Sequence, residues 1–452
     1  MRLPAPISLI VFLLLLAAFP LFADPVQTVA PGRVWITVDD HEVCIPAISS
    51  HPMNQQLPEI TRAIIVNPHY QREIVNVFNL LANSAQNHGV TDDLLIVGLQ
   101  YLVATDVLYH DLPDDVLYWT LNTWQWGHES EDLPELPRPV FASSYTFIDS
   151  TAHRIADLCP NLELLMVMGQ SAGAGMTQRY AGGTTLPGEF DSFTVTFLSS
   201  CLGHLMYLNE ERRELGTNDV FTLPPASQIA RCPGYNMYPY GLEDLNSYMA
   251  AQGADAIRQR YPTRWFVYLT GSLDNQLLPT FCPVLFQGFQ RVQKHRVFWN
   301  YLNYLYGPAI QFRQRMFVVD GVGHSTYGMF NSDLGRFFLF DWNPEAADGP
   351  DPFARQVSRQ ESTVPSPAVQ LNVHPNPFNE QVSVTVKDPS ARALTVTLYD
   401  LLGRQTLQRE LSASSGIRTL TIDASSLASG IYVLNVSTGG ESLASRRVVL
   451  LR

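Results

Sequence analysis

Between residues 63 and 342, short apolar runs alternate with amphipathic stretches, and this alternation constrains the fold more than any other feature. The run at 63–66 (AIIV) is continuously apolar, and the next segment places Ile74 and Leu81 at helical spacing before Gly89. Such strands, separated by helices, indicate a mostly parallel sheet with helices on both faces, so the sequence predicts an α/β fold. The other predicted strands are residues 94–97, 163–168, 193–198, 265–270 and 316–319, and a further helix is predicted around Ile148, Ala152 and Ile155.

The pattern changes near residue 343. Residues 343–377 contain seven prolines and little apolar periodicity, which is typical of an extended linker. Beyond them, residues 382–386 (VSVTV) and 394–398 (LTVTL) alternate with a period of two, as strands with one buried face do. We therefore expect a signal peptide at 1–23, an α/β domain at 24–345, a proline-rich linker at 346–368 and a small all-β sandwich at 369–452.

The first residues have the features of a secretory signal. Arg2 precedes the apolar run at 7–22, and the run ends at the small residue Ala23. The alternative is a membrane anchor, but the run is short for a membrane span and Pro20 interrupts it. We expect cleavage after Ala23, export of the chain, and no transmembrane anchor in the mature protein.

The net charge and the cysteine spacing exclude some classes of partner and site. The 29 Lys and Arg against 42 Asp and Glu give a net charge of −13, so no nucleic-acid partner is expected. The five cysteines lack paired C-x-x-C spacing, and we expect neither a zinc site nor a cofactor. In an exported chain a disulfide is plausible, and Cys232 with Cys282 is the favoured pair. Residues 39–42 (DDHE) resemble metal ligands but fit better as a solvated turn ahead of a strand.

Residues 169–173 (GQSAG) fit the pattern G-x-S-x-G and predict Ser171 as a nucleophile. The predicted strand at 163–168 runs directly into this motif, and a helix-compatible stretch follows it. A sharp strand-to-helix turn presents a serine hydroxyl above the sheet and points the next backbone N–H, here that of Ala172, at the substrate. The alternative is a tight turn with a buried serine.

A serine hydroxyl needs a base that is held by a carboxylate. His324 follows the predicted strand at 316–319, and Asp274 follows the one at 265–270, so both lie where open α/β sheets build their sites. The chain order Ser, Asp, His suits this fold. The competing residues are His204 and Asp320, although Asp320 lies too near His324 in sequence to orient it easily.

Over residues 35–342 the chain resembles the α/β-hydrolase superfamily of serine esterases and lipases. The shared landmarks are Trp119, Trp124, GQSAGAGMTQRYA at 169–181, CPGYN at 232–236, YLTGSLD at 268–274 and GVGH at 321–324. The resemblance implies the α/β-hydrolase fold and cleavage of carboxylic esters through an acyl-enzyme. One departure is residues 67–70 (NPHY), where such enzymes usually carry His-Gly. Because Pro68 has no N–H, the second oxyanion donor would come from His69 or Tyr70, beside Ala172.

The C-terminal part resembles the sorting domain of the type IX secretion system. The matching stretches are PNPFN at 375–379, LYDLLG at 398–403, LASGIY at 427–432 and the closing RRVVLLR at 446–452. The alternatives are a related module of flagellar hook-cap proteins and a generic β-sandwich spacer. The resemblance implies that the type IX machinery is a partner and that the protein is secreted or displayed on the cell surface.

The sequence therefore predicts a secreted serine hydrolase that cleaves carboxylic esters, with a polymeric ester as a substrate suggested by the compartment alone. Two alternatives stay open: a catalytically weak or inactive surface binding protein on this scaffold, motivated by Pro68, and a serine peptidase. The aromatic stretch at 118–126 is expected to pack in the interior more than to line a pocket. Tyr101 faces either the site or the core.

Overall fold

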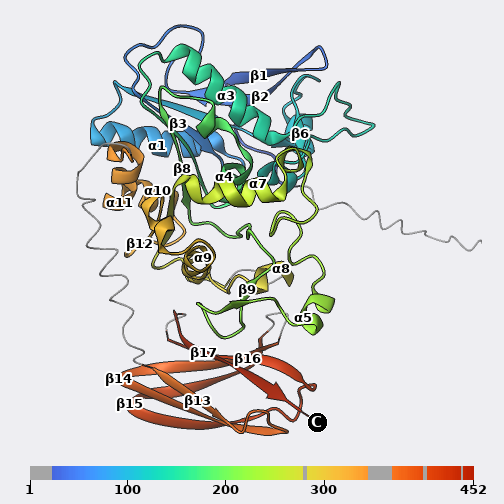
Figure 1. Ribbon diagram of the computed structural model, residues 1–452, viewed down its shortest axis with the longest axis vertical. Helices are drawn as coiled ribbons and strands as arrows, with labels where there is room; N and C mark the ends of the chain where they lie inside the picture. The colour runs from blue at the N-terminus through green and yellow to red at the C-terminus, as the bar shows by residue number, and fades with distance from the viewer. Residues whose placement is uncertain (1–22, 278–281, 345–368, 401–404, 439–440, 452) are drawn as a thin grey trace, which may run out of the picture.

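The computed structural model describes residues 23–277, 282–344, 369–400, 405–438 and 441–451. The predicted signal peptide, apart from Ala23, and the predicted linker at 346–368 lie outside these residues. The molecule is elongated, with the α/β part at one end and an all-β part at the other (Figure 1).

A single eight-stranded sheet organises the α/β part, in the order β1-β2-β4-β3-β7-β8-β11-β12. From β4 to β12 neighbouring strands are parallel, while β1 and β2 form an antiparallel hairpin at one edge. This is the α/β-hydrolase order, and the predicted fold class is confirmed. The strands are β1 (Gly32–Val38), β2 (His41–Ser49), β3 (Arg62–Asn67), β4 (Leu94–Leu99), β7 (Leu164–Gln170), β8 (Thr194–Ser200), β11 (Trp265–Gly271) and β12 (Gln314–Val319).

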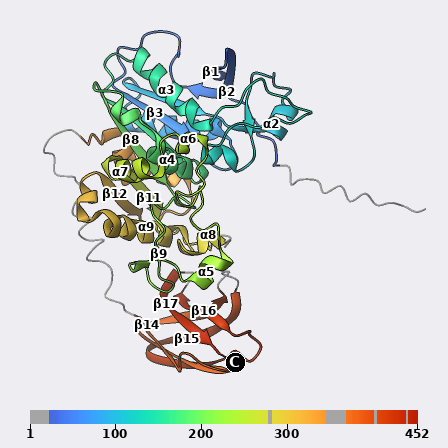
Figure 2. The same cartoon turned by 45° about the vertical axis from the view of Figure 1, so that its right-hand side comes forward.

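Each face of the sheet is buried beneath helices, as the apolar strands predict. In β3, Ala63 and Ile65 point into one core cluster, and Ile64 and Val66 point into the other. The first cluster lies under α3 (Ser144–Leu158), α4 (Ala172–Gly183), α7 (Ala254–Arg260) and α9 (Arg291–Tyr306), and the second under α1 (Ile74–His88), α10 (Thr326–Asn331) and α11 (Asp333–Arg336) (Figure 2). Helix α1 ends at Gly89, whose φ of 79° is the left-handed conformation that favours glycine.

The segments that connect the main strands and helices contain short strands and helices. They are β5 (Leu102–Val103) with β6 (Tyr118–Trp119), β9 (Arg212–Arg213) with β10 (Phe221–Thr222), and the helices α2 (Ala104–Tyr109), α5 (Ala226–Arg231), α6 (Ser247–Ala250) and α8 (Cys282–Leu285). Tyr101 is fully buried, with its ring 5.8 Å from Trp119 and 5.6 Å from Trp124. The aromatic stretch therefore packs in the interior, and so does Tyr101.

Cys232, just after α5, and Cys282, the first residue of α8, form a disulfide, which is the pair favoured from sequence. The other cysteines, Cys44, Cys159 and Cys201, are buried free thiols.

The all-β part is an antiparallel sheet with an apolar core of its own. Its strands are β13 (Gln370–His374), β14 (Gln381–Asp400), β15 (Gln405–Asp423), β16 (Gly430–Thr438) and β17 (Glu441–Leu450). The path runs β13-β14-β16-β17 with β15 paired to β14, and β13 also approaches β17, so the sheet curls into a nearly closed sandwich. Both sequence runs with a period of two lie within β14, which continues through register shifts between Asp388 and Leu394.

The two parts touch through stacked aromatic rings. Phe289, ahead of α9, stacks on Tyr399 of β14 with ring centroids 5.7 Å apart. In both views β16 and β17 lie on the side of α5 and β9 (Figures 1 and 2).

Candidate active site

Ser171 occupies the sharp turn between β7 and α4. Its backbone has φ 57° and ψ −111°, which is a strained conformation for a residue with a side chain. Its N–H donates to Ser200 O of β8 at 2.9 Å, which ties the turn to the neighbouring strand. The side chain is half-buried, so a substrate can reach the hydroxyl.

The two glycines of the motif allow backbone to approach backbone. A Cβ on Gly169 would lie 2.2 Å from the carbonyl carbon of Gly173. A Cβ on Gly173 would lie 2.5 Å from Pro68 O and 2.6 Å from Asn67 O. The start of α4 therefore packs directly against the segment that follows β3.

We expect Gly173→Ala to lower kcat by at least about 10²-fold, the cost of losing one oxyanion donor, because its Cβ must displace the segment after β3. Gly188→Ala is the matched control, since a Cβ there meets no atom within 4 Å. The measurement is kcat on a soluble ester, with circular dichroism to verify folding. Wild-type turnover in a folded Gly173→Ala would show that this close approach does not matter.

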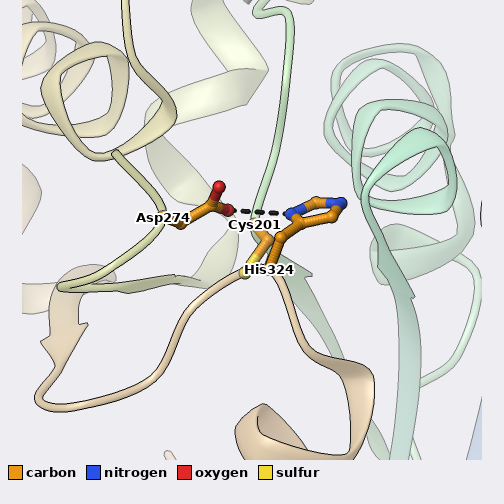
Figure 3. Close-up of side chains that lie close together, drawn as sticks. All are labelled: Cys201, Asp274 and His324. Atoms are coloured by element: carbon orange, nitrogen blue, oxygen red, sulfur yellow. Dashed lines mark hydrogen bonds and ion pairs between the residues drawn. The ribbon is translucent and has the colours of Figure 1, made fainter. Parts of the chain in front are cut away.

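His324 and Asp274 form a direct pair at the carboxyl ends of β12 and β11. His324 Nδ1 lies 2.8 Å from Asp274 Oδ2, and because a carboxylate only accepts, Nδ1 is the donor (Figure 3). The Asp274 side chain is 1% exposed and the His324 side chain 32% exposed. The other ring nitrogen of His324, Nε2, is thus left for proton transfer.

The environment of Asp274 keeps it ionised. Burial raises the pKa of this carboxyl, but the hydrogen bond from His324 and the charge of Arg291 outweigh burial and bring it below its ordinary value. Arg291, the first residue of α9, donates from Nη1 to Asp274 Oδ1 at 3.1 Å, so Arg291 and His324 bond different oxygens of the carboxylate. Arg291 was missed in the sequence, where its 17-residue separation from Asp274 carries no signal.

Two contacts hold the His324 loop against the rest of the site. Thr326 Oγ1 donates to Oε1 of Gln170, the residue immediately before Ser171. A Cβ on Gly271, at the end of β11, would lie 2.1 Å from Val322 O. Within the described part of the chain, no hydrogen bond joins Ser171 to His324, and catalytic hydrogen bonds are often loose before substrate binds.

The structure places the competing residues elsewhere. Asp320 Oδ1 accepts from Ser272 Oγ at 3.1 Å and does not bond to His324. His204 lies near Tyr240 with ring centroids 6.3 Å apart, and burial, followed by the charges of Lys294 and other basic neighbours, lowers its pKa well below the ordinary value. Of the candidates, Asp274 and His324 are the acid and base that meet.

The segment after β3 carries the candidate oxyanion donors His69 and Tyr70. In the described residues neither backbone N–H donates to another backbone group. Ala172 is the first residue of α4, where the helix leaves N–H groups free. Burial lowers the pKa of His69; the Glu73 charge opposes this shift, while the interaction with His324 adds to it.

Cys201 lies beside the pair and was not anticipated from sequence (Figure 3). Among the described residues, Cys201, Asp274 and His324 form a cluster that could hold a metal ion. Their potential ligand atoms all lie within 4.8 Å of one another. Burial and then the Asp274 charge raise the pKa of the Cys201 thiol to about 12, which disfavours the thiolate that binds metals. The arrangement suits a histidine base that is oriented by the Asp274 carboxylate better than metal binding.

The curled antiparallel sheet that ends the chain has a known counterpart. Residues 372–450 match the secretion system C-terminal sorting domain. The predicted resemblance of this region is thereby confirmed, and the sorting domain includes all of β14 to β17. It points to export toward the cell surface or beyond.

Solved structures similar to the α/β part are serine hydrolases. One is LpqC, a poly(3-hydroxybutyrate) depolymerase from Bordetella parapertussis, at 17% identity and a TM-score of 0.45, covering 73% of this chain and 93% of that one. Another is an alpha-beta serine hydrolase homologue from Coxiella burnetii, at 10% identity and a TM-score of 0.35, covering 70% of this chain and 99% of that one. A third is an S-formylglutathione hydrolase from Agrobacterium tumefaciens, at 11% identity and a TM-score of 0.35, with the same two coverages. No curated protein matches this chain. No helix among the described residues is long and apolar enough to span a membrane.

Proposed function

We propose that this protein is an exported serine hydrolase that cleaves carboxylic esters through an acyl-enzyme. The observation that carries the proposal is the 2.8 Å pair of His324 and Asp274 at the same sheet edge as the strained turn of Ser171. A strained turn and a base held by a buried carboxylate are the parts that serine acyl transfer requires.

In the proposed reaction, Ser171 Oγ attacks the ester carbonyl while His324 Nε2 takes the hydroxyl proton. Asp274 holds the imidazole and stabilises the cation that forms. The N–H of Ala172, together with that of His69 or Tyr70, binds the oxyanion. His324 then gives its proton to the departing alcohol, and a water molecule activated by the same histidine releases the acid.

Purified protein tested on 4-nitrophenyl esters of two to eight carbons and on peptide 4-nitroanilides separates the reaction classes. We expect ester hydrolysis that follows Michaelis–Menten kinetics and little amide cleavage. Faster turnover of the anilides would favour a serine peptidase. No turnover of either, with no labelling by a fluorophosphonate probe, would favour a binding protein, an alternative that rests on the missing N–H of Pro68.

The sorting domain gives a prediction about location. In a host with a type IX system, we expect deletion of residues 369–452 to leave the enzyme in the periplasm, because the deleted part holds the matched domain. The measurement is ester hydrolysis and immunoblotting of cell fractions and medium. Full-length Ser171→Ala is the control and is expected to be exported normally. Export of the truncated chain would contradict the proposed role of this domain.

A further inference from the structure

Three basic side chains are buried near the catalytic pair: Arg213 of β9, and Arg291 and Lys294 of α9. Their exposed fractions are 3%, 16% and 0%. We call them the basic cluster. Charged groups are rarely buried unless they are paired, so the partners of these three side chains matter.

Two donors of the cluster meet neutral oxygens. Lys294 Nζ donates to Gly203 O at 3.0 Å, and Arg213 Nη1 donates to Thr217 O at 3.0 Å. In the part of the chain that the structure describes, Arg291 is the member of the cluster that reaches a carboxylate, that of Asp274. Within the described residues, Nε and Nη2 of Arg213 and Nε of Arg291 are buried with no hydrogen-bond partner. Buried charged donors without partners are costly, and such positions point to a missing acceptor.

The positive charges within the cluster repel one another. Burial lowers the pKa of Lys294 well below its ordinary value, and the charges of Arg291 and Arg213 lower it further. Burial lowers the pKa of Arg213 to about 10. Among the described residues, no carboxylate counters these shifts at Arg213 or Lys294. An anion bound between these side chains would supply both the missing acceptor and the missing charge.

The cluster lies within substrate reach of the nucleophile. Ser171 N–H bonds Ser200 O, and Gly203, whose carbonyl accepts from Lys294, follows three residues later. Three residues span at most about 10 Å. Arg291 also contacts Asp274 directly. Lys294 therefore lies within about the length of a small ester from the Ser171 turn.

We infer that the basic cluster is a subsite for a carboxylate group carried by the ester substrate. The inference rests on the proposed function and narrows its substrate class to esters with a second, free carboxylate. That carboxylate belongs either to the acyl part or to the alcohol part. Guanidinium groups suit it because they donate two parallel hydrogen bonds to a carboxylate.

Kinetics on paired esters test the subsite with the full chain. The acyl pair is 4-nitrophenyl hydrogen adipate and 4-nitrophenyl hexanoate; the alcohol pair is 4-acetoxybenzoate and its methyl ester. We expect kcat/KM to favour the charged member of one pair by about tenfold to 100-fold, the worth of a hydrogen bond to a charged group. The favoured pair identifies which side carries the carboxylate.

Variants assign the preference to the cluster. Arg213→Gln is expected to bring the kcat/KM ratio of the favoured pair close to one. Lys294→Met, of similar volume, serves if Arg213→Gln does not fold. The matched control is Arg154→Gln on α3, an exposed arginine that donates to Met53 O, and it should keep the wild-type ratio. Equal rates on both members of each pair, or an unchanged ratio in the cluster variants, would overturn the subsite.

A binding measurement separates this inference from the proposed function. Sodium adipate, compared with sodium chloride at equal ionic strength, is expected to raise the melting temperature of the wild type but not of Arg213→Gln. If a fluorophosphonate fails to label Ser171 while adipate still stabilises the protein, the proposed function is wrong and the anion site stands. If Ser171 is labelled but adipate has no effect and no charged ester is preferred, the site is overturned.

Discussion

Ser171→Ala is expected to fold like the wild type and to lose about 10⁶-fold in kcat on soluble esters, the scale of loss when a triad serine is removed. The reason is that the acyl-enzyme cannot form without the hydroxyl, whereas Ala keeps the Cβ that the backbone turn already accommodates. The measurement is initial-rate kinetics, with a thermal melt to verify the fold.

Ser150→Ala is the matched control, because Ser150 lies on α3 and bonds only Trp35 O. It should retain wild-type turnover. If Ser171→Ala kept more than a few per cent of the wild-type rate while folded, another residue would have to be the nucleophile.

Asp274→Asn is expected to lose about 10⁴-fold in kcat with little change in shape. An amide at this position can donate to His324 Nδ1 and so favours the tautomer with its proton on Nε2, which cannot accept the Ser171 proton. Asp320→Asn is the matched control, since Asp320 bonds Ser272, and it should lose far less. Equal losses in the two folded variants would show that Asp274 is not the acid.

The pH dependence of the rate distinguishes the two candidate bases. Turnover should rise with pH as the catalytic base becomes neutral, because only a neutral imidazole accepts the Ser171 proton. The pKa of Asp274 lies below its ordinary value, so this carboxylate is already ionised throughout that rise. His324→Ala should abolish the rising limb with most of the activity, and His204→Ala should keep both. The reverse result would contradict the assignment.

The elements of the fold that could be predicted from the sequence are those specified by a pattern within a few neighbouring residues. The buried strand β3 and the helix α1, which ends at Gly89, are examples, since continuous apolar runs and a glycine at a left-handed position are determined within a few residues. Strand β1 was not anticipated because it is not a continuously buried apolar run: Ile36 is its buried residue, and it pairs antiparallel with β2 at the edge of the sheet.

The predicted acid and base came from strand ends, which topology brings to one edge of the sheet. Cys201 directly follows β8, so the same signal could have found it, and a backbone turn with φ 54° brings it to the pair. Arg291 could not be found this way. It reaches Asp274 from the first residue of α9, which depends on how that helix packs against the sheet, and no spacing in the sequence encodes that.

The most direct test of the central claim is the site of covalent labelling by a fluorophosphonate on the purified full chain, mapped by mass spectrometry of its peptides. An activated serine is required for this reaction, so the probe reports the nucleophile itself rather than the fold. The proposed mechanism predicts one phosphonate adduct, on the peptide that contains Ser171, and none in Ser171→Ala. An unlabelled wild-type protein, or an adduct on a different serine, would contradict it.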